Sequence, residues 1–171
     1  MNLEAYIRDV PDFPKAGILF KDITPLLKAP EAFREAVHLL SRQVSGRQID
    51  AVVGIESRGF IFGAAIACQL GVGFVPVRKP GKLPADTVKE EYALEYGTDA
   101  LEIHRDAILP GTKVLLVDDL LATGGTAAAA CRLVEGLGGK IVHVAFLVEL
   151  AFLEGRDRLK GHEISSILVY E

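Results

Sequence analysis

Stretches of consecutive apolar residues recur along this chain, separated by polar turns and by segments with helical spacing. The clearest is Val114-Leu115-Leu116-Val117, which is typical of a strand buried on both faces of a parallel sheet. Two carboxylates, Asp118 and Asp119, follow directly and are expected to end this strand. After a loop that contains two glycines, the alanine-rich residues 127–134 predict a helix. This unit of strand, loop and helix is the centre of the predicted fold.

The other segments continue the alternation of strands and helices. Pro30 can begin a helix, because Phe33, Val37 and Leu40 follow it at helical spacing. Further helices are predicted near residues 6–8 and at residues 61–70. Strands are predicted at residues 50–55, 71–77, 140–147 and 164–170, the last at an edge of the sheet. The pattern predicts an α/β protein with a central, mostly parallel sheet flanked by helices and right-handed crossovers.

Three polar segments follow predicted strands, at residues 56–60, 78–82 and 118–126. Ligand sites in parallel sheets lie beyond the carboxyl ends of the strands, so these segments are expected to converge on one site. Arg58, in the first of them, is better placed for a phosphate contact than for the alternative of a plain surface charge.

The loop before the helix at residues 127–134 has the composition of a phosphate site. Its glycines allow a close approach of the backbone, and the start of the helix supplies N–H groups and the positive end of a dipole. The predicted phosphate loop comprises Ala122, Thr123, Gly124, Gly125 and Thr126. It has neither the lysine of a P-loop nor the G-x-G-x-x-G of a dinucleotide fold.

The adjacent carboxylates indicate which phosphate compound binds. Asp118 and Asp119 would repel a phosphate unless they accept hydrogen bonds from a sugar diol or face a magnesium ion carried by the ligand. The residues therefore predict a ribose 5-phosphate, with its hydroxyl groups on the two acids. The alternative is a surface turn with two solvated acids.

A long connection follows the predicted strand at residues 71–77. It opens with the basic sequence Arg78-Lys79-Pro80-Gly81-Lys82 and continues to residue 101 with several charges and two tyrosines. Connections of this length in a small domain are often functional. Residues 78–101 are predicted to form a mobile lid that attracts an anion and excludes water, the alternative being a solvated charged hairpin.

The composition narrows the function further. The 171 residues are expected to form one domain, and half of them are hydrophobic. The net charge of −4, without a basic run, argues against a nucleic-acid surface, and no apolar stretch is long enough for a membrane helix. Without a signal-peptide pattern at the N-terminus, and with Cys68 and Cys131 expected to be buried and reduced, a cytoplasmic location is the expectation. Residues 1–30 are expected to form an irregular arm and residues 153–161 a charged loop.

Residues 114–126 resemble the 5-phosphoribosyl pyrophosphate (PRPP) signature of the type I phosphoribosyltransferases. Flanking blocks in this order are similar to the adenine-specific branch of that family. They are Pro11-Asp12-Phe13-Pro14, Gly17-Ile18-Leu19-Phe20-Lys21-Asp22-Ile23, Glu56-Ser57-Arg58-Gly59-Phe60, Arg78-Lys79-Pro80-Gly81-Lys82-Leu83-Pro84, Leu94-Glu95-Tyr96-Gly97 and Val148-Glu149-Leu150.

The resemblance implies a type I phosphoribosyltransferase fold in which residues 1–30 form a hood over the purine and residues 78–101 the lid. It implies purine contacts from Leu19, Phe20, Lys21 and Leu150. It implies pyrophosphate contacts from Ser57, Arg58, Arg78, Lys79 and Lys82. Glu95 would protonate or orient the base, with Tyr96 beside it in the lid, and Asp118 and Asp119 would hold the ribose.

The implied reaction is adenine plus PRPP giving AMP and pyrophosphate, a step of purine salvage. Magnesium would arrive with PRPP, and the enzyme would be a homodimer. Two alternatives remain open at this point: the same transfer to hypoxanthine, guanine or xanthine, and a non-catalytic regulator that senses PRPP.

Overall fold

The computed structural model describes residues 1–94 and 97–171, which divide into two compact units, Met1–Leu39 and Leu40–Glu171. Glu95 and Tyr96, predicted to act in the lid, lie outside the described residues. No helix among the described residues is long and apolar enough to cross a membrane.

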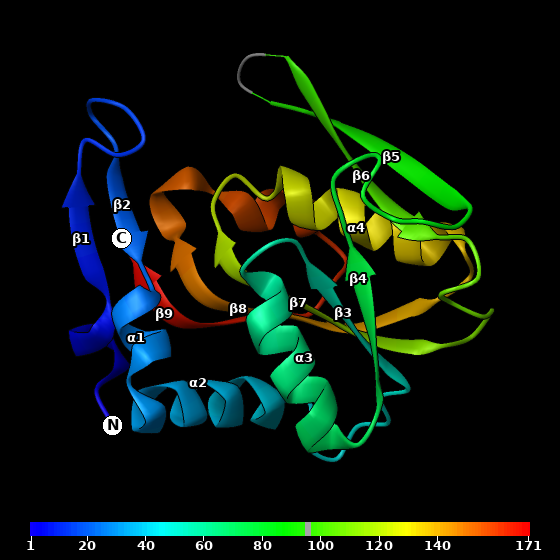
Figure 1. The fold of residues 1–171 in the computed structure, drawn as a ribbon, viewed down its shortest axis with the longest axis horizontal. Coiled ribbons are helices and arrows are strands. Elements are labelled where there is room, and N and C mark those ends of the chain that lie inside the picture. Colours follow the sequence, from blue (N-terminus) through cyan, green and yellow to red (C-terminus); the bar gives the residue numbers. More distant parts are fainter. Residues whose placement is uncertain (95–96) are drawn as a thin grey trace. The chain divides into compact units, whose positions relative to one another are not determined.

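The unit Leu40–Glu171 is built on a five-stranded sheet in the order β4-β3-β7-β8-β9 (Figure 1). All four neighbouring pairs are parallel, which confirms the predicted α/β class. The strands are β3 (Ala51–Ile55), β4 (Gly73–Val77), β7 (Lys113–Leu121), β8 (Lys140–Leu150) and the edge strand β9 (Ile164–Tyr170). Helix α3 (Gly59–Leu70) connects β3 to β4, and α4 (Gly125–Gly136) connects β7 to β8.

The two helices cover opposite faces of this sheet. The steps from β3 to β4 and from β7 to β8 run in opposite directions along the sheet, so right-handed crossovers place α3 and α4 on different faces. Successive side chains along each strand point to opposite faces of the sheet. Val53 and Leu116 belong to the cluster with α4. On the other side Gly54 is so close to Phe74 and Gly59 that a Cβ at this glycine would collide with the Phe74 ring, at 2.6 Å.

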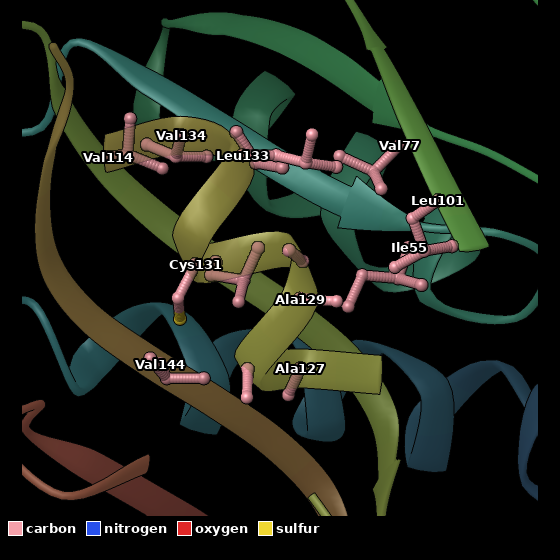
Figure 2. Packing of buried hydrophobic residues seen from close by; sticks show 14 of the residues in the cluster. Ile55, Val77, Leu101, Val114, Ala127, Ala129, Cys131, Leu133, Val134 and Val144 are labelled. Carbon is pink, nitrogen blue, oxygen red and sulfur yellow. The ribbon is translucent and has the colours of Figure 1, made fainter. Parts of the chain in front are cut away.

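The main hydrophobic core joins α4 to the sheet and to a β-hairpin (Figure 2). Small side chains of α4, among them Ala127, Ala129 and Cys131, are almost completely buried. Ile55 and Leu101 belong to the same cluster. Short side chains let a helix lie close to strands, so the sequence of α4 brings its first turn against the end of β7.

The hairpin consists of β5 (Thr87–Ala93) and β6 (Thr98–His104), paired antiparallel in register from Thr87↔His104 to Ala93↔Thr98. An isolated bridge joins Arg78, just after β4, to Glu102 of β6. Much of the predicted lid segment is therefore regular structure. Its inner side chains, including Tyr92 and Leu101, belong to the core.

The unit Met1–Leu39 contains a short 3-10 helix η1 (Leu3–Tyr6), the antiparallel strands β1 (Arg8–Pro11) and β2 (Leu19–Asp22), and helix α1 (Thr24–Lys28). Helix α2 (Pro30–Arg42) begins at Pro30, as predicted. The short helix predicted near residues 6–8 lies a few residues earlier, as η1, because Arg8 already starts β1. The arm is also more regular than expected, since β1 and β2 pair with each other.

Three further predictions about local structure are corrected. The acids do not end the central strand: β7 continues to Leu121, and β8 continues beside it as far as Leu150. Residues 153–161 contain short 3-10 helices rather than only loop, η2 (Ala151–Leu153) and η3 (Gly155–Leu159). Cys68 is exposed on α3, whereas Cys131 is buried as expected.

Candidate active site

The sheet reverses its winding between β3 and β7, and the cavity lies at their carboxyl ends. Crevices at such reversals are the usual ligand sites of parallel sheets. The cavity has a volume of about 360 Å³. Its walls come from residues after β3, after β4 and along the end of β7: Glu56, Ser57, Arg58, Lys79, Asp118, Asp119, Leu120, Leu121, Ala122, Thr123, Gly124, Thr126 and Ala127. The structure thus brings together side chains of all three segments that the sequence singled out.

The predicted phosphate loop ends at the start of α4. Gly124 is the N-cap, with φ of +81°, and has no side chain with which to cap the helix. A Cβ there would collide with the carbonyl oxygen of Gly155 in η3, so only glycine fits. The N–H groups of the first helical turn are therefore available to an anion, and Thr126 adds a hydroxyl at the cavity wall.

The two acids stand in different surroundings. Asp118 Oδ1 accepts a hydrogen bond from the Asp119 N–H at 2.9 Å, and Asp119 Oδ2 accepts one from Arg58 Nε at 2.6 Å. Gly59 allows α3 to start close to Asp118, because a Cβ at Gly59 would lie 2.7 Å from Asp118 Oδ1. Burial, together with the neighbouring charge of Asp119, raises the pKa of Asp118 well above its ordinary value. Asp118 is thus a site where a cationic or hydroxylic ligand would relieve an unfavourable charge.

Glu56 binds three residues of the basic segment that follows β4. Its Oε2 accepts hydrogen bonds from the Lys79 N–H at 2.7 Å and from Arg78 Nε at 3.3 Å, and its Oε1 pairs with Lys82. Burial raises the pKa of Glu56, but the hydrogen bonds from Lys82 and Lys79 outweigh it, so the pKa lies below the ordinary value. This role of Glu56 was not predicted from the sequence, although Glu56 directly precedes the predicted Ser57 and Arg58. Arg78 and Lys82 do not line the cavity; they face Glu56 beside it.

The predicted purine contacts fall in both compact units. Leu19, Phe20 and Lys21 lie on β2, where the Phe20 ring meets Phe13 edge to face at 5.1 Å and Lys21 Nζ binds Asp9 at 2.6 Å. Leu150 is the half-buried last residue of β8 in the other unit. The purine site stays a prediction, as does the part assigned to Glu95 and Tyr96.

The segment next to Leu150 is fixed by an ion pair between the buried Glu149 and the half-exposed Arg156. Glu149 Oε1 and Oε2 each accept a hydrogen bond from the Arg156 guanidinium at 2.7 Å. Arg156 thereby holds the pKa of Glu149 below its ordinary value. The pair ties the end of β8 to η3, which also supports Gly124.

Comparison with known proteins identifies the family to which this architecture belongs. The profile of the phosphoribosyl transferase domain matches residues 22–167. The adenine phosphoribosyltransferase of Thermotoga maritima is 60% identical over 99% of this chain and 98% of its own length. The chain belongs to the adenine phosphoribosyltransferase family.

Solved structures of adenine phosphoribosyltransferases share the fold over almost the whole chain. The enzyme from Thermoanaerobacter pseudethanolicus superposes with a TM-score of 0.96 at 56% identity, covering 98% of each chain. The enzyme from Saccharomyces cerevisiae, in a complex with an imino-altritol bisphosphate and adenine, gives a TM-score of 0.91 at 45% identity, covering 97% of this chain and 96% of its own. These matches confirm the family and the type I phosphoribosyltransferase fold that the sequence led us to expect.

Proposed function

We propose that this chain transfers the 5-phosphoribosyl group of PRPP to adenine, giving AMP and pyrophosphate in purine salvage. The observation that carries the proposal is the cavity at the ends of β3 and β7. There adjacent carboxylates share the cavity wall with an uncapped helix start and with the cations Arg58 and Lys79. A sugar with phosphate groups at both ends matches this distribution of charge. The adenine specificity is supported by full-length relatives such as the Thermotoga maritima enzyme.

The 5-phosphate of PRPP would bind the loop from Ala122 to Thr126, where backbone N–H groups and the Thr123 hydroxyl can donate to it. The ribose hydroxyls would then reach Asp118 and Asp119 on the preceding strand. As the bond to pyrophosphate breaks, positive charge develops on the sugar ring, and these carboxylates stabilise it. No covalent nucleophile is required, because positioning and electrostatics can carry this step.

The pyrophosphate would bind among Ser57, Arg58, Lys79, Arg78 and Lys82. In the structure Arg58 is paired with Asp119. PRPP offers a better partner to each of them, its pyrophosphate to Arg58 and a ribose hydroxyl to Asp119. Binding of PRPP would therefore exchange this internal ion pair for contacts with both parts of the substrate.

Leu19, Phe20, Lys21 and Leu150 would contact the purine, with Phe20 stacking on its face. Glu95 would hydrogen-bond the imidazole edge of the base, and Tyr96 would approach with it. These roles rest on the resemblance of the motifs in this sequence to those of the family.

Magnesium would enter as part of the substrate. Among the described residues no group of three or more His, Cys, Asp or Glu side chains is arranged to hold a metal. The oxygen ligands of Asp118 and Asp119 are nevertheless of the kind that Mg²⁺ accepts, so they fit a magnesium complex of PRPP. A homodimer and a cytoplasmic location are further proposals. Size-exclusion chromatography with light scattering tests the first, and the unpaired Cys68 and Cys131 agree with the second.

The experiment is an assay of the purified chain with PRPP and each purine base, with and without Mg²⁺. We expect AMP and pyrophosphate from adenine only in the presence of magnesium. Turnover of hypoxanthine or guanine without turnover of adenine would contradict the proposed specificity.

A further inference from the structure

Lys79 is held at both ends by groups outside the predicted set of pyrophosphate ligands. Its N–H binds Glu56, while its Nζ is hydrogen-bonded to Asp99 of β6 and to the Tyr92 hydroxyl of β5, the latter at 2.9 Å. The ammonium group also lies 5.5 Å from the centre of the Tyr92 ring. The side chain of Lys79 at the cavity wall is therefore placed by the hairpin.

The Tyr92 hydroxyl connects this lysine to the phosphate loop. It accepts hydrogen bonds from Lys79 Nζ and, at 3.3 Å, from Thr126 Oγ1, and it donates one to Asp99 Oδ2 at 3.2 Å. Two acceptor positions and one donor are all that a tyrosine hydroxyl offers, so each is used. The ring is buried and packs against the first turn of α4, where a Cβ at Gly125 would lie 3.3 Å from Tyr92 Cδ2.

The opposite charges of Lys79 and Asp99 stabilise the contact between them. Burial lowers the pKa of Lys79, but the hydrogen bonds to Asp99 and Tyr92 outweigh it, and the pKa lies above its ordinary value. The hydrogen bond from Lys79 in turn lowers the pKa of Asp99. Both groups are thus charged at neutral pH.

We propose that Tyr92 and Asp99 are positioning residues for PRPP, which fix Lys79 and Thr126 relative to each other. The inference rests on the proposed function, in which Thr126 belongs to the 5-phosphate site and Lys79 to the pyrophosphate site. PRPP carries both groups on one ribose, so its binding depends on the spacing of the two sites. AMP and pyrophosphate each occupy only one of them.

Because PRPP occupies both sites and AMP only one, a loss of affinity for PRPP alone indicates a positioning role rather than a merely structural one. Tyr92→Phe removes the hydroxyl and keeps the buried ring. We expect the KM for PRPP to rise about tenfold, which corresponds to the loss of one hydrogen bond to a charged group. The KM for adenine, the affinity for AMP alone and the melting temperature should stay within about twofold or 2 °C of the wild-type values. Asp99→Asn should act in the same direction.

The matched control is Glu91→Gln. Glu91 neighbours Tyr92 on β5, but its side chain is exposed and paired with Lys89 on the same strand. This variant should leave the KM for PRPP unchanged. A double-mutant cycle of Tyr92→Phe with Lys79→Met should be strongly non-additive, because either change removes the same connection.

The outcomes are distinct. If the wild-type chain makes no AMP, the proposed function fails. If the wild type is active but both Tyr92→Phe and Asp99→Asn keep its KM for PRPP, or the double-mutant cycle is additive, the positioning role is wrong. Equal loss of affinity for PRPP, AMP and adenine, together with a lower melting temperature, would also contradict it. Should Tyr92→Phe fail to fold, the part-exposed Asp99→Asn carries the same test.

Discussion

Charged residues in and beside the cavity are paired with one another. Arg58 is paired with Asp119, and Glu56 holds both Arg78 and Lys82. Asp118 differs from these, because burial and the adjacent Asp119 leave its carboxylate poorly compensated, with a raised pKa. Paired charges keep the site ordered at little cost in stability, whereas Asp118 is a group kept for function at the expense of stability.

Exchange of the two acids for amides should therefore change stability in opposite directions. Because folding raises the pKa of Asp118, the folded chain loses stability as pH rises from the unfolded pKa of an aspartate, about 3.9, through the raised folded value, so Asp118→Asn should raise the melting temperature at neutral pH. Asp119→Asn removes the partner of Arg58 and should lower it. Both should reduce kcat by about 100-fold or more, since each removes charge that stabilises the transition state. Thermal unfolding combined with the AMP assay checks this, and a lower melting temperature for Asp118→Asn would contradict it.

The pair of Glu149 and Arg156 gives a pH-dependent prediction. A carboxyl whose pKa is lowered by folding contributes stability above its unfolded pKa, about 4.3, and the contribution is lost as pH falls through the lower folded value. At pH 7 Glu149→Gln should lower the melting temperature by about 3–6 °C. The difference from wild type should shrink below about pH 4, because protonated Glu149 resembles glutamine. A difference that stays constant from pH 7 to pH 3 would show that the charge of Glu149 does not matter.

At the scale of elements, the site depends on how three strand ends and one helix start meet. The sequence predicted the strand, loop and helix unit well, because its apolar run, its glycines and its alanines are neighbours in the chain. It placed the end of β7 wrongly at Asp118. The reason is tertiary: β8 runs alongside to Leu150, and its ladder keeps the residues after the acids in the sheet. Glu56, Tyr92 and Asp99 were missed for a similar reason, since each contacts a residue at least 20 positions away in the chain.

The contact between the phosphate loop and η3 is tested by Gly124→Ala. The added Cβ would meet the Gly155 carbonyl, and φ of +81° is unfavourable for alanine, so the melting temperature should fall by about 4–10 °C and the KM for PRPP should rise. Gly136→Ala, in the last turn of the same helix, is the matched control. A Cβ there has no neighbour within 4 Å, and its melting temperature should be unchanged or slightly higher. Equal behaviour of the two variants would contradict the structural role of Gly124.

At the scale of the whole molecule, a parallel sheet wound in both directions from β3 and β7 creates one crevice, and the chain places its phosphate-binding chemistry there. This architecture could be predicted because strands and helices alternate regularly along the sequence. The purine site could not be derived in the same way, since its predicted residues, Leu19 to Lys21 and Leu150, are far apart in the sequence and follow no shared pattern. Base specificity is therefore supported by sequence similarity to adenine phosphoribosyltransferases, while the ribose phosphate site is supported by the geometry of the cavity.

The central claim is that a ribose 5-phosphate binds at the end of β7, and a crystal structure of the chain with AMP tests it most directly. We predict the phosphate on the N–H groups of residues 122–126 and the ribose hydroxyls within hydrogen-bond distance of Asp118 and Asp119. AMP bound elsewhere, with this cavity empty at saturating nucleotide, would contradict the account.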